Sequence, residues 1–154
     1  MMIMIEQLQS HEGFKSDFFF RHFSSQVIGY GRKASNRTFS SVELLMLGRE
    51  DFNDKPMTKE EAEMLLVNDV KAIIALLEVR IPWYKLSPAR KATCVNMSYS
   101  IGVDKFLNQT ALIDALNDGD YLQAAAELLN TRWADTVGTR AEDLALQLNS
   151  GSWQ

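Results

Sequence analysis

Few residue types suited to metal or nucleophilic chemistry occur in this chain of 154 residues. Cys94 is the single cysteine, which excludes an intrachain disulfide and does not suit a cysteine-built metal site. The two histidines, His11 and His22, fit no zinc-binding spacing, so we expect no metal and no cofactor. Acid–base chemistry is left to the 20 Asp and Glu residues and to the two histidines, since an imidazole can accept a proton near neutral pH.

The overall composition is that of one folded domain. Hydrophobic residues make up 46% of the chain, charged residues 23%, and the net charge is −4. Such a chain is not disordered, and the lack of a basic surplus argues against nucleic acid as a partner. No apolar run approaches the ~18 residues of a membrane span. The apolar residues 1–5 are short and are followed by Glu6, so we expect no signal peptide and a cytoplasmic protein.

The elements that must position these residues begin with a short amphipathic helix over residues 2–11, which Gly13 ends. Two β-forming stretches follow, Phe18-Phe19-Phe20 and Val27-Ile28, with a polar stretch between them. They predict a small antiparallel hairpin or three-stranded sheet, which needs a helix to pack on. At least one ring of the Phe18–Phe20 run should face outwards.

Two capping boxes mark helix starts further along the chain. Ser40 with Glu43 predicts a short helix through about Leu47, and Thr58 with Glu61 opens the clearest helix of the chain. Apolar residues recur there at steps of three and four through residues 58–79.

The C-terminal half is expected to be helical. Ser87-Pro88 predicts the start of a helix that is apolar nearly all round, and therefore buried, and that Gly102 ends. Further helices are expected over 108–116, 121–129 and 140–148, with Arg132-Trp133 in a connection and Trp133 in the core. Cys94 should be a small buried hydrophobe.

Several motifs together resemble the T4-type phage lysozymes and the lambdoid endolysins, over essentially the whole chain. In chain order the motifs are His11-Glu12-Gly13, Val27-Ile28-Gly29-Tyr30-Gly31, Met57-Thr58-Lys59-Glu60-Glu61-Ala62-Glu63, Asn68-Asp69-Val70, Asn96-Met97 before Gly102, Asn130-Thr131-Arg132-Trp133, Thr139-Arg140-Ala141-Glu142 and Ser150-Gly151-Ser152-Trp153.

The resemblance implies a fold and an activity. The fold class is α+β and lysozyme-like, mainly helical with a small antiparallel sheet. One domain over residues 1–154 would divide into a β-containing lobe (13–57), an interlobe helix (58–79) and a helical lobe (80–154 with 1–12). The activity is hydrolysis of the β-1,4 bond between N-acetylmuramic acid and N-acetylglucosamine in peptidoglycan, in a cleft between the lobes.

Only one of the three catalytic positions keeps the residue type that the resemblance implies. Glu12 matches the family's acid. At the family's spacing, Arg21 stands where an aspartate is expected and Val27 where a threonine is expected. An arginine cannot accept a proton from water, and valine has no hydroxyl to hold one. A cation near Glu12 would also lower the pKa of an acid that should stay protonated.

Other residues could compensate. Asp17 could serve as a substitute base if the hairpin register differs from the family's, and His22 could do so from its position beside Arg21. The family's histidine after Gly-x-Gly is replaced by Arg32, which we expect to form a salt bridge with Asp69 on the interlobe helix. Arg140 matches an arginine near the catalytic glutamate. Tyr30 and Tyr99 could stack on sugars or belong to the core.

The function expected from the sequence is therefore an endolysin-type muramidase with Glu12 as its acid and with weakened activity. A lysozyme-like protein that binds peptidoglycan or a protein partner without cutting it is the alternative. A monomer that depends on a holin to leave the host cytoplasm is expected. The acidic net charge is weak evidence against efficient lysis of an anionic wall.

Overall fold

The computed structural model describes residues 1–21, 25–33, 38–52 and 55–154, with only the backbone described for residues 19, 20, 21 and 25. Contacts divide the chain into two compact units, Met1–Asp69 and Val70–Gln154. The helix α3, Lys59–Leu77, contains the boundary. The division into lobes that the sequence implies, at 13–57, 58–79 and 80–154 with 1–12, stays a prediction.

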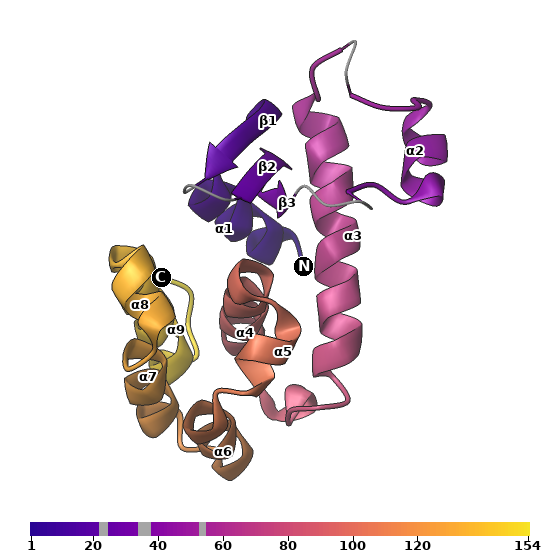
Figure 1. Ribbon diagram of the computed structural model, residues 1–154. Coiled ribbons are helices and arrows are strands. Elements are labelled where there is room, and N and C mark those ends of the chain that lie inside the picture. The colour runs from indigo at the N-terminus through magenta and orange to yellow at the C-terminus, as the bar shows by residue number, and fades with distance from the viewer. Residues whose placement is uncertain (22–24, 34–37, 53–54) are drawn as a thin grey trace. The chain divides into compact units, whose positions relative to one another are not determined.

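The first unit combines helices with a small sheet (Figure 1). Its elements are α1 (Met2–Glu12), β1 (Lys15–Arg21), β2 (Ser25–Gly29), β3 (Arg32–Lys33), α2 (Ser41–Leu47) and the first part of α3. The sheet is antiparallel with the order β1-β2-β3, as the β-forming stretches predict. Both capping boxes form: Ser40 with Glu43 begins α2, and Thr58 with Glu61 begins α3.

A bulge interrupts β1 near its beginning. Lys15 pairs with Gly29 and Phe19 pairs with Val27, so four steps along β1 face two steps along β2. The carbonyl of Ser16, inside the bulge, accepts a hydrogen bond from the backbone N–H of Met57 at 2.8 Å. The bulge therefore contacts the segment that leads into α3, and the sheet is anchored there.

Aromatic and aliphatic side chains fill the core of the first unit. Ile28 from β2 packs with Phe52, Met57, Ala62 and Leu65. Phe39 lies between Phe52 and Phe18, with ring centroids 4.7 and 6.5 Å away. Phe18 keeps 39% of its surface exposed, which agrees with the expectation that one ring of this run faces outwards.

Gly29 allows β2 to lie close to α3. Its φ is 64°, and a Cβ atom there would stand 3.0 Å from Sδ of Met57 and 3.2 Å from Cβ of Ala62. A side chain at this position would be strained both by its backbone conformation and by its neighbours.

The second unit is helical in the part that the structure describes. Its elements are the end of α3, the 3₁₀ helix η1 (Trp83–Lys85), α4 (Pro88–Ile101), α5 (Val103–Leu107), α6 (Thr110–Asp118), α7 (Tyr121–Leu129), α8 (Arg132–Val137) and α9 (Thr139–Ser150). Every residue from Ala92 to Ser98 is buried, so α4 is central, as its all-round apolar pattern predicts. It packs on α9, which packs on α7.

One expectation for this half is wrong. Arg132 and Trp133 are not in a connection but begin α8, because the Thr131 hydroxyl accepts from the backbone N–H of Ala134 and caps the helix. Gly102 ends α4 as expected, and the short helix α5, which the sequence does not predict, follows it directly. Trp133 is nonetheless core, as expected, and its indole donates to the Ser100 hydroxyl at 2.8 Å.

Candidate active site

Glu12 is the last residue of α1, and its side chain is buried, with 7% of its surface exposed. Gly13 ends the helix with a positive φ of 69°, and its N–H donates to the carbonyl of Gln9. The chain then enters β1. A carboxyl group kept from water in this way must find polar partners within the protein. The end of the helix thus presents a shielded carboxyl group just before the sheet.

Val27 lies in the middle strand with 3% of its surface exposed. It pairs with Phe19 of β1 on one side and with Lys33 of β3 on the other. The side chain offers no hydrogen-bonding group, and the site is closed to water by its burial. This position of the sheet therefore cannot hold a water molecule as a threonine hydroxyl could.

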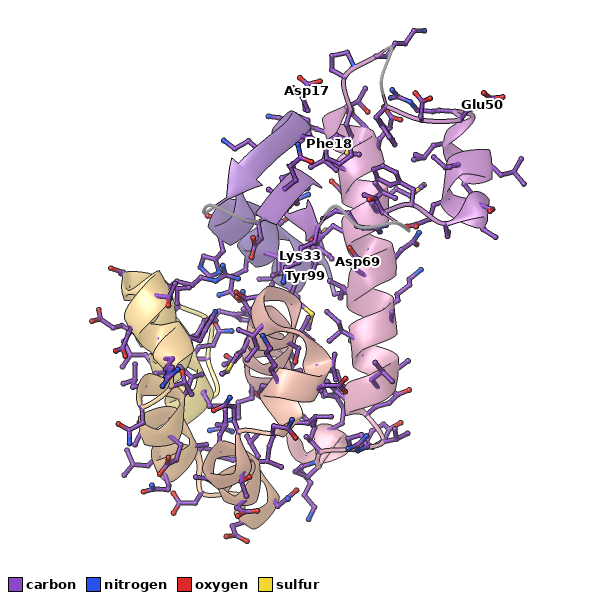
Figure 2. The ribbon with its side chains drawn as sticks, in the orientation of Figure 1. Asp17, Phe18, Lys33, Glu50, Asp69 and Tyr99 are labelled. Atoms are coloured by element: carbon purple, nitrogen blue, oxygen red, sulfur yellow. The ribbon has the colours of Figure 1, made fainter. Side chains whose placement is uncertain are left out.

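The structure describes Arg21, His22 and Asp17 of the hairpin to different extents. Arg21 pairs with Ser25 through the backbone, while its side chain lies outside the described residues, as does all of His22. Asp17 is exposed within the bulge of β1 and accepts a hydrogen bond from the Ser16 hydroxyl at 3.1 Å. Figure 2 shows Asp17 near the beginning of β1.

Arg32 and Asp69 form the predicted ion pair. Nε of Arg32 donates to the Asp69 carboxylate at 3.0 Å. The contact joins β3 to α3, and Figure 2 places Asp69 on that helix. The ion pair expected from the sequence is therefore present, with Arg32 as its cation.

Glu43 is a second carboxylate that bonds to the Arg32 guanidinium, and the sequence did not predict this contact. The Arg32 nitrogens Nη1 and Nη2 donate to its two oxygens at 3.0 and 2.7 Å. Asn68 donates to it at 3.3 Å, and the backbone N–H of Ser40 at 3.0 Å. The capping box was the available signal, because it places Glu43 at the start of α2 with its carboxylate turned back towards the helix end.

The two carboxylates are affected differently by their shared cation. Hydrogen bonds from Arg32 lower the pKa of Glu43 to about 2, although burial acts in the opposite direction. Burial raises the pKa of Asp69, against the attraction of Arg32, and the negative charge of Glu43 adds to the rise. Burial tends to lower the pKa of Arg32, but the hydrogen bonds and charges of both carboxylates raise it overall. One guanidinium thus bonds to two carboxylates. It stabilises the charged form of Glu43 more strongly, because it forms a bidentate pair with that residue.

Tyr30 is half-buried and packs against the core of the first unit. Its ring lies 5.6 Å from the ring of Phe14, and it packs against the buried cluster around Ile28. Burial, and then the charges of Glu63 and Glu60, raise the pKa of its hydroxyl. These contacts identify Tyr30 as a packing residue. Its role in binding sugar stays a prediction.

Arg140 and Tyr99 lie in the second unit. Arg140, on α9, donates to the side-chain oxygen of the buried Asn96 from Nε at 2.9 Å and from Nη2 at 2.6 Å. Its guanidinium also lies over the Trp133 ring, 5.8 Å from the centroid. Tyr99 is half-buried on α4. The geometry thus explains how Asn96 and Trp133 hold Arg140, whose part in catalysis stays a prediction.

Cys94 takes no part in this chemistry. Its side chain is buried within α4, and burial raises the pKa of its thiol to about 12. The thiol is therefore neutral at physiological pH, which agrees with its expected role as a small hydrophobe.

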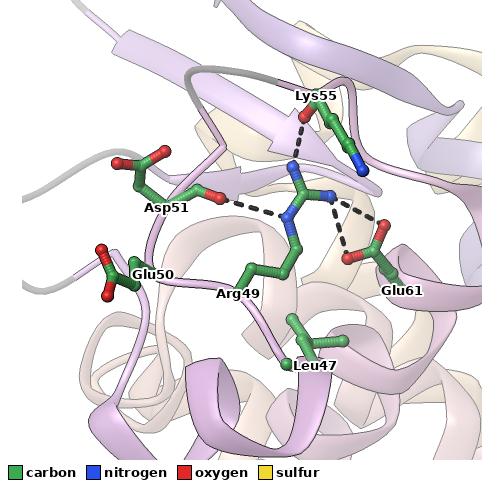
Figure 3. Close-up of a pocket in the computed structure, with 7 residues that line it drawn as sticks. Leu47, Arg49, Glu50, Asp51, Lys55 and Glu61 are labelled. Atoms are coloured by element: carbon green, nitrogen blue, oxygen red, sulfur yellow. Dashed lines mark hydrogen bonds and ion pairs between the residues drawn. The ribbon is translucent and has the colours of Figure 1, made fainter.

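A polar pocket of about 490 Å³ lies elsewhere in the first unit, between α2 and the start of α3 (Figure 3). Arg49 lies across it and donates to both oxygens of Glu61 at 2.9 and 3.0 Å, and to the backbone carbonyls of Asp51 and Lys55. Its guanidinium also stacks 3.9 Å from the centroid of the Phe52 ring. Arg49 connects the segment after α2 to α3. Because its contacts are all within the protein, we interpret the pocket as part of the scaffold.

Residues 1–21, 25–33, 38–52 and 55–154 contain no group of three or more His, Cys, Asp or Glu side chains arranged for a metal ion. None of the helices within those ranges has the length and hydropathy that a bilayer crossing requires.

Comparison with known proteins agrees with the resemblance seen in the sequence. A family model described as phage lysozyme matches residues 9–147, which is nearly the whole chain. The matched range contains Glu12, Val27, Arg32, Asp69 and Arg140. No curated protein matches the chain significantly.

Proposed function

Since this chain belongs to the phage lysozyme family, we propose that it is an endolysin-type muramidase acting on peptidoglycan. The bond cut is the β-1,4 link between N-acetylmuramic acid and N-acetylglucosamine. The observation that carries this proposal is the family match over residues 9–147, together with a buried glutamate at the end of α1.

Glu12 is the proposed general acid. Glycoside hydrolysis needs a carboxyl group that delivers a proton to the leaving oxygen. Glu12 stands at the family's position for this acid, directly before Gly13, and its burial limits exchange with bulk water. A positioned acid of this kind contributes typically about 10²–10⁴-fold to the rate.

The proposed activity is slow, because the groups that would activate water are replaced. An inverting glycosidase uses a second carboxylate about 6.5–9.5 Å from the acid to deprotonate the attacking water. Arginine at position 21 has no lone pair for that proton, and the buried Val27 has no hydroxyl. Asp17, which is exposed in the bulge of β1, and His22 are the two candidates for a substitute base.

The test is lysis by the purified protein. Chloroform-treated Gram-negative cells should clear slowly, and isolated peptidoglycan should gain new reducing ends. Glu12→Gln should abolish both, because the amide has no proton of suitable acidity to give. Glu6→Gln, an exposed change on the same helix, should leave both rates unchanged. Clearing that persists in Glu12→Gln would exclude Glu12 as the acid.

A non-catalytic peptidoglycan-binding protein is the second candidate. The observation that favours it is Val27, since a buried aliphatic side chain stands where the family needs a hydroxyl. On this alternative the protein releases no reducing ends at high concentration but retains muropeptides in a pull-down. The same preparation can be used for both measurements, so one experiment separates the two functions.

Access to the wall is part of the proposal. We infer that the protein accumulates in the host cytoplasm and reaches the peptidoglycan through a holin, and that it acts as a monomer. Co-expression with and without a holin should show lysis only when the holin is present.

A further inference from the structure

A basic segment surrounds the end of α3 in an otherwise acidic chain. Residues 70–103 contain five Lys or Arg residues and one acid, Glu78, whereas the net charge of the whole chain is −4. Two of the five cations are held within the protein. Arg90 donates to two backbone carbonyls of α9, and Lys91 lies 5.2 Å from the centroid of the Trp83 ring. The remaining three are exposed, namely Lys71, Arg80 and Lys85.

Two of these cations flank an apolar face at the end of α3 (Figure 1). The helical path continues past the end of α3, because the N–H of Ile81 donates to the carbonyl of Leu77. Successive residues of an α-helix advance by about 100° around its axis. Lys71 and Arg80 therefore lie on opposite edges of the exposed half, and Glu78 lies outside it, between Lys71 and the buried half. Between the two cations the exposed residues are Ala72, Ala75, Leu76 and Val79.

The apolar residues of this face are far from buried. Leu76 keeps 53% of its surface exposed and Val79 keeps 75%. A helix face that is apolar in the middle and carries Lys or Arg at its edges is typical of helices that lie in a membrane interface. The long stems of Lys and Arg let the charge reach the head groups while the apolar residues sit deeper.

The turn after α3 adds an exposed aromatic ring. Tyr84 of η1 keeps 84% of its surface exposed, while its neighbours Trp83 and Leu86 are buried and hold the turn in place. Lys85 follows Tyr84 directly and is exposed too. Tyrosine is enriched where a membrane meets water, because one end of its ring is apolar and the other is polar.

We propose that this surface docks on a lipid bilayer that contains anionic phospholipid. The α3 face, defined by Lys71, Ala72, Ala75, Leu76, Val79 and Arg80, makes the contact, with Tyr84 and Lys85 beside it. Phosphate head groups complement the cations, and the head-group boundary accommodates Leu76 and Val79. A soluble polyanion would match the charges but offer nothing to those two side chains. Because the rest of the chain is acidic, an anionic surface repels its other parts and selects this orientation.

This inference goes beyond the proposed function, since docking needs neither Glu12 nor a wall substrate. The experiment is flotation of the full chain with lipid vesicles at low salt. Vesicles of phosphatidylglycerol mixed with phosphatidylethanolamine should bind the protein about 10- to 100-fold more tightly than vesicles of phosphatidylcholine, given about five-fold for each exposed cation near the surface. In about 0.5 M salt this preference should shrink, because exposed charges are screened.

Two double variants separate the charged and the apolar parts of the face. Lys71→Gln with Arg80→Gln should weaken binding to the anionic vesicles about 20-fold, which is five-fold for each charge. Leu76→Ser with Val79→Ser keeps both charges and should weaken it about ten-fold, because the apolar contact is lost.

Matched controls remove the same groups elsewhere. Lys59→Gln with Lys105→Gln removes two exposed charges, and Leu122→Ser with Leu129→Ser removes two exposed leucines of α7. Both controls should bind like the unmodified protein. Circular dichroism of every variant shows that a loss of binding is not a loss of folding.

A label reports which face meets the lipid. In a Cys94→Ala background, Val79→Cys carrying an environment-sensitive dye should shift its emission to the blue on anionic vesicles, whereas the same dye on Leu129→Cys should not. Equal shifts at both positions would overturn the assignment of the face.

The remaining outcomes are also decisive. Failure to bind anionic vesicles, or equal binding to both kinds of vesicle, overturns the inference even if the protein cuts peptidoglycan. Binding that falls in the charge variant but not in Leu76→Ser with Val79→Ser also overturns it, because the surface would then meet a polyanion rather than a bilayer. Losses in both variants and in neither control support it even if no cutting is ever detected.

Discussion

The guanidinium of Arg32 holds the carboxylate of Glu43 in a bidentate pair, with N–O distances of 3.0 and 2.7 Å. The pair joins the last strand of the sheet to α2, and its two side chains are 14% and 11% exposed. Asp69 of α3 bonds to the same guanidinium. Three elements of the first unit therefore meet at one cation.

Removing that cation should destabilise the protein strongly. Arg32→Ala would leave the buried Glu43 and the partly exposed Asp69 without their positive partner. Breaking a buried pair costs about 3–5 kcal/mol, and the exposure of Asp69 places the expected loss towards the lower end of that range. Urea denaturation at neutral pH measures the loss. Arg49→Ala removes a different arginine–glutamate pair of the same unit and serves as a comparison. A loss below about 1 kcal/mol for Arg32→Ala would contradict the importance of the cluster.

Stability should also depend on pH through Glu43. Its folded pKa is about 2, below the ordinary value of 4.5, so its contribution is present above pH 4.5 and is lost as the pH falls towards 2. The shift corresponds to about 3 kcal/mol. Asp69 acts in the opposite direction, since its pKa is raised, and offsets part of that loss on acidification.

The measurement compares Glu43→Gln with the unmodified protein in urea between pH 6 and pH 2. The variant should be less stable at pH 6, and the difference should shrink as the pH falls. Glu6→Gln, at an exposed position of α1, should follow the unmodified protein throughout. A difference that stays constant over this range would contradict the assigned pKa of Glu43.

Restoring the family's water-activating groups tests the proposed cause of slow turnover. Arg21→Asp with Val27→Thr should raise the rate of reducing-end formation by two or more orders of magnitude, because a general base contributes about 10²–10⁴-fold. Each single change should give much less. The new hydroxyl at the buried position 27 should cost about 1–3 kcal/mol of stability if it finds no partner. Unchanged turnover in the double variant would refute the alignment of the hairpin.

Cys94 should resist thiol reagents in the folded protein. Its burial and raised pKa, about 12, leave almost no thiolate at pH 8. Reaction with Ellman's reagent should be slow in buffer and complete within minutes in 6 M guanidinium chloride. Rapid reaction of the folded protein would show that α4 opens readily. Cys94→Ala reports any reaction that does not come from the thiol.

The fold could be anticipated from the sequence where local signals agreed with packing. The capping boxes at Ser40 and Thr58 marked two helix starts, and the all-round apolar pattern after Pro88 identified the central helix α4. Arg132 was placed wrongly because a single Thr131 cap was overlooked. Helix ends are set by individual hydrogen bonds of this kind, which periodicity does not detect.

The site was anticipated only in part. The Arg32–Asp69 pair followed from the resemblance and is confirmed. The contact between Glu43 and Arg32 was not predicted, because it depends on the tertiary arrangement of α2 and β3, which local sequence patterns do not reveal. The bulge in β1 was also not foreseen, since residue spacing alone does not reveal where a strand takes extra steps.

The bulge has a consequence for how such hairpins change over evolution. Side chains along a strand alternate between the two faces of the sheet. Two extra residues in β1 therefore keep the other side chains of the strand on their original faces, whereas one extra residue would move them to the opposite face. Loss of Phe18 and Phe19 would carry Asp17 to the place opposite Val27 and leave the pairing of residues 20 and 21 intact. One short deletion could thus deliver a carboxylate to the centre of the sheet, and the reverse insertion could withdraw it.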